Sequence, residues 1–286
     1  LDANGEASIT TGDIDNGSSD NCSFALSLDS TDFDCSELGA NTVTLTATDV
    51  GSNTDTCHAT VTVLDTISPS AVCQDITVYL DGSGNASITG TDVDGSSSDN
   101  CSITSRSVST SSFTCSDVGA NSVLLTVSDA SGNSDTCTAT VTVADTTSPT
   151  ASCQNITVYL DGAGSASITA GDIDNGSTDN CGIAGLSVSP ALFSCSDAGA
   201  NTVILTVTDV NGNSSTCTAT VTVADTTAPT ASCQNVTVYI DGSGSASLTA
   251  NDIDNGSSDN CGVASLSLDS TNFDCTEVGA NTVTLT

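Results

Sequence analysis

Apolar and polar residues alternate along most of this chain. In "NTVILTVTD", Val203, Leu205 and Val207 occupy every second position. In "TCTATVTV", Ala219 and Val221 do the same, with threonine between them. Such alternation predicts strands with one buried face and one face exposed to solvent. Because the turn "VNGN" separates the two segments, we expect them to form an antiparallel hairpin.

Shorter segments with the same alternation precede this hairpin. "QNITVYL" places Ile156, Val158 and Leu160 on one face, and "SASIT" follows the glycine-rich turn "DGAG". These two segments are expected to be antiparallel strands joined by that turn. "IAGLSVS" and "LFSC" supply further short strands. About seven strands in about 80 residues are typical of an all-β, immunoglobulin-like sandwich.

The whole pattern repeats along the chain. Cys22, Cys101, Cys181 and Cys261 recur at intervals of 79, 80 and 80 residues. A period of this length suits a small self-contained domain better than one turn of a solenoid, so we expect a tandem array of domains. The incomplete repeats at both ends predict a piece of a longer protein. The expected division is a partial first repeat at 1–72 without its N-terminal strand, a second repeat at 73–152, a third at 153–232, and a partial fourth at 233–286 with an incomplete C-terminal hairpin.

The composition is strongly acidic. The chain has 35 aspartates and glutamates, a single lysine or arginine, and a formal net charge of −34. Nucleic acid and anionic membrane surfaces are therefore poor partners. Charged residues make up only 13% of the chain, and the regular apolar alternation indicates a folded protein instead of a disordered one. Aromatic residues make up 3%, so each small core is expected to need covalent cross-links.

Fourteen cysteines supply these cross-links. They keep a regular spacing without paired Cys-x-x-Cys motifs, and the chain has one histidine, which argues against zinc. Disulfides in an oxidising, extracellular environment are the expected state. Four cysteines per repeat allow three pairings, and the predicted positions of the loops favour one of them. The expected disulfides are Cys73–Cys101, Cys115–Cys137, Cys153–Cys181, Cys195–Cys217, Cys233–Cys261 and Cys35–Cys57, with the partners of Cys22 and Cys275 outside this sequence.

An acidic loop, "DIDNGSTDNC" in the third repeat, occurs in every copy. Asp172 and Asp174 point the same way in an extended segment, and a turn brings Asp179 back toward them. Asp209 and the linker residue Asp145 are expected at the same end of the domain. Oxygen ligands in such a loop suit Ca²⁺, although the closing glutamate of an EF-hand is missing. The candidate ligands of structural Ca²⁺ at or near the domain junctions are Asp13, Asp15, Asp20, Asp49, Asp92, Asp94, Asp99, Asp129, Asp172, Asp174, Asp179, Asp209, Asp252, Asp254 and Asp259.

A metal-free interpretation of the same loops stays open. Asp, Asn, Gly and Ser are ordinary turn formers, and their side chains cap turns without any ion. High acidity can also serve solubility in a salty habitat, where the charges are screened.

The segments "DNCG" and "TVTDVNGNSSTCTATVTV" resemble the hyalin-repeat (HYR) family. The resemblance covers the whole chain and is greatest to HYR-like repeats in giant surface adhesins of Bacteroidota, including gliding adhesins. It implies an immunoglobulin-like sandwich, an extracellular location, and a role in adhesion or as an extended stalk. The cysteine in "LFSCSDAG" departs from the usual HYR pattern. The linker "DTT" or "DTI" resembles a short O-glycosylation motif of Bacteroidota, which implies glycans on Thr66, Thr146 and Thr226.

An enzymatic function is not expected. His58 and Arg106 each occur in one copy only, so the repeats share no set of residues from which to build a catalytic site. We predict the stalk or filament of a large extracellular, cell-surface adhesin, stiffened by Ca²⁺ and disulfides. Its expected partners are neighbouring repeats, identical chains in a fibre, and a glycan or host surface bound by a region outside this sequence. In the alternative, each repeat is itself a glycan- or protein-binding module acting by avidity.

Overall fold

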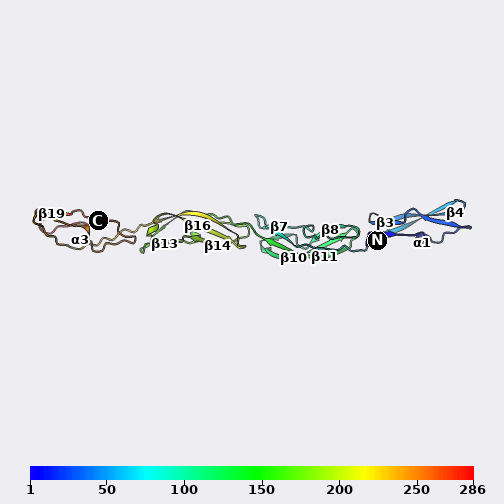
Figure 1. Ribbon diagram of the computed structural model, residues 1–286, viewed down its shortest axis with the longest axis horizontal. Coiled ribbons are helices and arrows are strands. Elements are labelled where there is room, and N and C mark those ends of the chain that lie inside the picture. The colour runs from blue at the N-terminus through cyan, green and yellow to red at the C-terminus, as the bar shows by residue number, and fades with distance from the viewer. The chain divides into compact units, whose positions relative to one another are not determined.

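The computed structural model describes residues 1–286, which consist almost entirely of strands and loops (Figure 1). The chain divides into two compact units, Leu1–Thr146 and Thr147–Thr286, and each is described by itself. The expected repeat boundaries remain a prediction, and repeats are named below by those ranges. The strands of the first unit are β1 (Glu6–Ser8), β2 (Phe24–Leu28), β3 (Asp32–Asp34), β4 (Gly39–Asp49), β5 (Thr54–Val63), β6 (Ile76–Tyr79), β7 (Asn85–Ser87), β8 (Ile103–Val108), β9 (Ser112–Thr114), β10 (Gly119–Asp129) and β11 (Ser134–Ala144).

The second unit is built from short and long strands of the same kinds. Its strands are β12 (Ile156–Tyr159), β13 (Ser165–Ser167), β14 (Ile183–Ser189), β15 (Leu192–Ser194), β16 (Gly199–Asp209), β17 (Ser214–Ala224), β18 (Ser245–Ser247) and β19 (Asn272–Asp274). Helical structure is limited to single turns in both units. These turns are α1 (Thr11–Ile14), α2 (Ala170–Ile173) and α3 (Ala250–Ile253), with 3₁₀ turns η1 (Cys35–Glu37), η2 (Cys115–Asp117), η3 (Cys195–Asp197) and η4 (Cys275–Glu277).

Each complete repeat is a sandwich of two sheets. In the second repeat, four strands form a sheet in the order β6-β11-β10-β8, and β7 pairs with β9 in a smaller sheet. β6 runs parallel to β11, whereas the other pairs are antiparallel. The third repeat has the same arrangement, with the sheets β12-β17-β16-β14 and β13-β15. The predicted fold class is confirmed, because these are tandem, disulfide-linked, immunoglobulin-like domains.

The long hairpin forms as the alternation predicted. β10 and β11 pair with Val123 opposite Ala139 and Leu125 opposite Cys137. Val123, Leu125 and Ala139 are completely buried, while the threonines between them in β11 are exposed. Branched aliphatic side chains fit the buried face of a pleated strand and stabilise it by packing against the smaller sheet. The core of each repeat is therefore built chiefly on this hairpin.

The first two strands of each repeat do not form the expected hairpin. β12 pairs with β17, and β13 pairs with β15, so the two strands belong to different sheets. The turn between them is closed by the Asp161 carboxylate, which accepts hydrogen bonds from the backbone N–H groups of Ala163 and Ser165. This turn moves the chain from one sheet to the other. Alternation identifies the buried face of a strand, but it does not identify the strand beside it.

One disulfide of each complete repeat joins its beginning to its last strand. Cys73 is bonded to Cys137, with 5.7 Å between their Cα atoms, and Cys153 is bonded to Cys217 at 5.9 Å. The parallel pairing explains both bonds, because Ile76 of β6 lies opposite Val141 of β11 and the two cysteines precede these positions by similar distances. The expected pairs Cys73–Cys101, Cys115–Cys137, Cys153–Cys181 and Cys195–Cys217 are therefore wrong.

A second kind of disulfide joins consecutive repeats. Cys35 is bonded to Cys101, and Cys195 is bonded to Cys261. In each bond the first cysteine starts a 3₁₀ turn and the second ends the acidic loop of the following repeat. The expected pairs Cys35–Cys57 and Cys233–Cys261 are consequently also wrong. The bonds between repeats were not predicted because all of the expected pairs lay within one repeat. Four exposed cysteines are free, namely Cys22, Cys57, Cys233 and Cys275.

Candidate cation site at the junction of two repeats

The junction of the first and second repeats lies within the first unit, where several contacts hold it. Asp65 follows β5 in the linker, and its backbone oxygen accepts a hydrogen bond from the side-chain amide of Asn133, at 3.1 Å. The amide of Asn100 donates to the backbone oxygen of Asp2 at 3.2 Å and to Asp65 Oδ1 at 3.1 Å. Together with Cys35–Cys101, these contacts tie the linker and the first repeat to two loops of the second.

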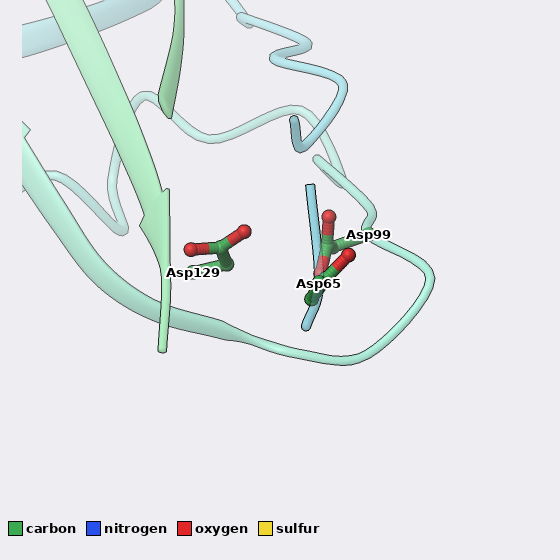
Figure 2. Close-up of side chains that lie close together, drawn as sticks. All are labelled: Asp65, Asp99 and Asp129. Atoms are coloured by element: carbon green, nitrogen blue, oxygen red, sulfur yellow. The ribbon is translucent and has the colours of Figure 1, made fainter. Parts of the chain in front are cut away.

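Three aspartates from three separate segments meet at this junction (Figure 2). Asp65 belongs to the linker, Asp99 to the acidic loop before β8, and Asp129 to the end of β10. One carboxylate oxygen of each lies within 4.8 Å of the others. We call this group the junction cluster. The long hairpin positions Asp129, and the linker positions Asp65, so the cluster exists only where one repeat follows another.

Two of the three aspartates in the junction cluster are buried, and two carboxylate oxygens of the cluster have no hydrogen-bond partner. Asp65 is only 6% exposed and Asp129 only 5%. Asp65 Oδ2 and Asp99 Oδ1 are buried oxygens without a hydrogen-bond partner. Burying a charged oxygen without a partner is costly, and neighbouring like charges add repulsion. A bound cation would remove both costs, so an unpartnered, buried oxygen of Asp65 supports a cation site more directly than acidity alone.

The remaining oxygens of the cluster are held by nearby N–H groups. Asp99 Oδ2 accepts hydrogen bonds from the backbone of Cys101 and Ser102, each at 3.1 Å. Asp129 accepts from the backbone and side chain of Asn133, at 2.8 and 2.7 Å. Burial raises the pKa of Asp129, but the hydrogen bonds from Asn133 outweigh it, so the pKa is lowered overall. Asp129 is therefore a fixed anion that needs little rearrangement to bind a cation.

The chemistry of these donors suits a hard divalent cation. All of the candidate ligand atoms are carboxylate oxygens, which Ca²⁺ and Mg²⁺ prefer. Ca²⁺ accepts six to eight oxygens in flexible geometry, whereas Mg²⁺ requires a strict octahedron. Ligands from three independent segments favour the more flexible ion. Such an ion would hold the linker, the acidic loop and the hairpin together, which is a structural role.

The acidic loops contribute fewer ligands than we predicted. The first aspartate of each loop accepts the backbone N–H and the hydroxyl of a threonine three residues earlier, at 2.6 to 2.8 Å. It therefore closes a local turn and lies outside the junction cluster. The residues in this position are Asp13, Asp92, Asp172 and Asp252.

The second aspartate of each loop also serves a local turn. It accepts the backbone N–H of a serine three residues later, at 2.9 to 3.1 Å. In the second repeat, Asp94 also forms an ion pair with Arg106 at 2.7 Å. These residues too lie outside the cluster, and they are Asp15, Asp94, Asp174 and Asp254.

The third aspartate of each loop has a different local hydrogen-bond partner. Asp20, Asp99, Asp179 and Asp259 each accept the N–H of the cysteine two residues later, at 2.8 to 3.1 Å. The aspartate at the end of each long hairpin strand accepts a hydrogen bond from the backbone N–H of the asparagine four residues later. These aspartates are Asp49, Asp129 and Asp209. Of these candidates, only Asp99 and Asp129 belong to the junction cluster of the first unit.

Asp65 was not among the predicted ligands. The equivalent Asp145 was expected at this end of the domain, but no linker aspartate was included among the candidate ligands. The "DTI" segment was interpreted as a glycosylation motif, and modification of the exposed Thr66 stays a prediction. The sequence does contain a signal for these linker aspartates. Asp65, Asp145 and Asp225 recur with the same spacing as the cysteines, which indicates a role shared by the repeats. Asp65 and Asp145 are both buried, which is unusual for a linker aspartate.

The second unit reproduces most of these junction contacts independently. Asn260 donates to the backbone oxygen of Asp161 at 3.0 Å and to Asp225 Oδ1 at 3.2 Å. Asp259 Oδ1 is buried without a hydrogen-bond partner, as Asp99 Oδ1 is in the first unit. The Cys195–Cys261 disulfide corresponds to Cys35–Cys101. The arrangement is therefore a property of the repeat and not of one position.

Comparisons with known proteins show only distant similarity. No protein-family model and no curated protein matches the chain. Extracellular cadherin domains 1–4 of protocadherin gamma B7 are 12% identical with a TM-score of 0.33, over 86% of this chain and 78% of that chain. Mouse clustered PcdhgC3 EC1-3 is 14% identical with a TM-score of 0.28, over 66% and 78%. Sidekick-1 immunoglobulin domains 1–4 are 10% identical with a TM-score of 0.31, over 67% and 60%.

The disulfides are the evidence for the cellular environment. Bonds within and between repeats indicate an oxidising, extracellular setting. No helix has the length and apolar character needed to cross a membrane.

Proposed function

We propose that this chain is the stalk region of a large extracellular, cell-surface adhesin with HYR-like repeats. Its repeats would be spacers, held in fixed relation by a disulfide and by Ca²⁺ at each junction. The observation that carries the proposal is the Cys35–Cys101 bond beside the junction cluster. A chain of freely moving binding modules has no need of a covalent bond and a buried acidic cluster between its modules.

The physical effect of such a junction is stiffness. A linker of a few residues normally leaves neighbouring domains free to reorient. Here the linker is fixed by Asn133 and Asn100, and the disulfide adds a second covalent connection between the repeats. Ca²⁺ at Asp65, Asp99 and Asp129 would neutralise the remaining repulsion. Repetition of this unit would carry an adhesive tip away from the cell surface.

Ca²⁺-dependent stiffness can be tested on the oxidised full chain. We expect millimolar Ca²⁺ to raise the melting temperature by about 10–20 °C relative to EDTA, since a ligand at 100 times its Kd stabilises a domain by about 2.7 kcal/mol. Small-angle scattering should show a larger maximum dimension with Ca²⁺. The matched variants are Asp99→Asn and Asp20→Asn, because both aspartates accept the same local hydrogen bond but only Asp99 belongs to the junction cluster.

The two variants separate a junction effect from a loop effect. Asp99→Asn should lose the part of the Ca²⁺ response that comes from the junction of the first and second repeats, whereas Asp20→Asn should keep the whole response. Identical melting temperatures and scattering curves for the wild type in Ca²⁺ and in EDTA would contradict the proposal. In that case the acidic loops would be metal-free turns, and stiffness would depend on the disulfides alone.

A further inference from the structure

Three consecutive residues connect the junction cluster to the inter-repeat disulfide. Asp99 contributes a carboxylate to the cluster, and Cys101 forms the bond to Cys35. Between them, Asn100 donates hydrogen bonds to Asp65 Oδ1 and to the backbone oxygen of Asp2. A movement of this segment away from the first repeat would therefore change the cluster and the disulfide together.

The segment is also packed tightly against the first repeat. The backbone oxygen of Asn100 lies 3.7 Å from Cys35 Sγ. Gly5, in the turn before β1, faces both atoms, and a Cβ there would lie 2.6 Å from Cys35 Sγ and 2.8 Å from the Asn100 oxygen. Both separations are too short for real atoms, so the turn, the sulfur and the Asn100 backbone have no space between them. The disulfide consequently holds the segment in one position.

This arrangement has a thermodynamic consequence. Without the disulfide, a cation would have to order the Asp99–Cys101 segment against the linker at the cost of conformational entropy. With the disulfide in place, much of that ordering has already occurred, so the cation binds more tightly. Linkage is reciprocal, so the cation must favour the closed disulfide by the same factor.

We propose that the Cys35–Cys101 disulfide and the cation site of the junction cluster are coupled, each stabilising the other. This inference rests on the proposed function, because it requires that the junction cluster binds Ca²⁺. The covalent step is ordinary thiol–disulfide exchange with a dithiol such as dithiothreitol. The Cys35–Cys101 S–S bond breaks and gains two electrons and two protons as two thiols, while the dithiol is oxidised to its cyclic disulfide. The junction thus responds to extracellular Ca²⁺ and to reductant jointly.

The second unit supports the same coupling with different residues. Asn260 precedes Cys261, and its backbone oxygen lies 3.5 Å from Cys195 Sγ. A Cβ on Gly164 would lie 2.6 Å from that sulfur and 2.8 Å from the Asn260 oxygen. These distances match those of the first unit.

The test measures the disulfide equilibrium of the full chain in a buffer of reduced and oxidised dithiothreitol, with Ca²⁺ or EDTA. Free thiols are alkylated and each cysteine is quantified by peptide mass spectrometry. We expect Ca²⁺ to raise the equilibrium constant for the Cys35–Cys101 bond about tenfold, a common size for such coupling. Cys73–Cys137, within the second repeat, is the internal control and should change far less. Asp65→Asn should abolish the effect of Ca²⁺ on Cys35–Cys101.

The reciprocal measurement is a calorimetric Ca²⁺ titration of the full chain and of the double variant Cys35→Ser/Cys101→Ser. One class of sites should bind about tenfold more weakly in the double variant. If the wild type binds no Ca²⁺, both the proposed function's cation and the coupling are wrong. If it binds Ca²⁺ but the Cys35–Cys101 equilibrium is unchanged, only the coupling is wrong. If the double variant fails to fold, the coupling is tested by the disulfide equilibrium of the wild type and of Asp65→Asn alone.

Discussion

The glycine in the turn before the smaller sheet offers a direct test of the junction packing. Gly5 and Gly244 occupy equivalent turns with positive φ, at +77° and +82°. An alanine at either position costs about 1–2 kcal/mol, because the left-handed conformation brings Cβ close to the backbone. The surroundings differ, since Gly5 faces the following repeat and the nearest atom to a Cβ on Gly244 is Cys275 Sγ at 3.4 Å. Gly244→Ala is therefore a matched control for Gly5→Ala.

The additional cost of Gly5→Ala follows from the distances at the junction. The new methyl group would lie 2.6 Å from Cys35 Sγ and 2.8 Å from the Asn100 oxygen. Forcing an extra methyl group into a close-packed site typically costs about 1–3 kcal/mol. This cost applies only while the repeats are docked. Because 1.4 kcal/mol corresponds to a factor of ten, the equilibrium constant for the Cys35–Cys101 bond should fall by about 5- to 150-fold.

The assay is the disulfide equilibrium of each full-chain variant in a dithiothreitol redox buffer with EDTA, resolved by cysteine. Gly5→Ala should weaken Cys35–Cys101 and leave Cys195–Cys261 unchanged. Gly164→Ala should give the opposite result, and Gly244→Ala should affect neither bond. A wild-type equilibrium for Cys35–Cys101 in Gly5→Ala would refute the reasoning, because it would mean that the repeats are not docked as closely as these distances require.

Two further predictions concern stability. Replacing Cys153 and Cys217 by serine removes a bond that spans 64 residues, and urea unfolding followed by circular dichroism should show a loss of about 4 kcal/mol in the third repeat. Cys57→Ser, at an exposed free cysteine, should have little effect. The lowered pKa of Asp129 predicts a pH dependence without Ca²⁺: its stabilisation is complete above the unfolded pKa of about 3.9 and is lost as the pH falls through the lower folded value. Asn133→Ala should reduce this acid sensitivity, and an unchanged profile would disprove the assignment.

The fold could be predicted from the sequence where local pattern decides the structure. The alternation in "NTVILTVTD" and "TCTATVTV" is satisfied by a single arrangement, since a shift of one residue would expose Val203, Leu205 and Val207. The pairing of β12 with β17 could not be obtained in this way. Those strands are far apart in sequence, and their alternation is compatible with several neighbours. The disulfides within repeats were missed for the same reason. Cys153 lies just before β12, and the parallel pairing of β12 with β17 places it beside Cys217.

The candidate site could be predicted only in part. Asp99 and Asp129 were expected ligands, and the structure brings them within 4.8 Å of each other and of Asp65. The sequence does not distinguish them from Asp92 and Asp94, because all four lie in segments rich in turn formers. The distinction is spatial, because Asp99 and Asp129 lie beside Asp65 of the linker, whereas Asp92 and Asp94 do not. That depends on the local backbone conformation and on the linker of the preceding repeat.

The gathering of negative charge in each acidic loop therefore has two physical causes. In the second repeat, Asp92 and Asp94 serve the loop itself, since Thr89, Ser97 and Arg106 supply their hydrogen bonds. Neither carboxylate needs an ion. The third aspartate keeps one oxygen unpartnered, and it does so beside the cysteine that crosses to the preceding repeat. A loop that served only its own turn would have no reason to leave that oxygen buried and unsatisfied. The local aspartates thus fix the shape of the loop, and that shape presents the remaining carboxylate to the junction.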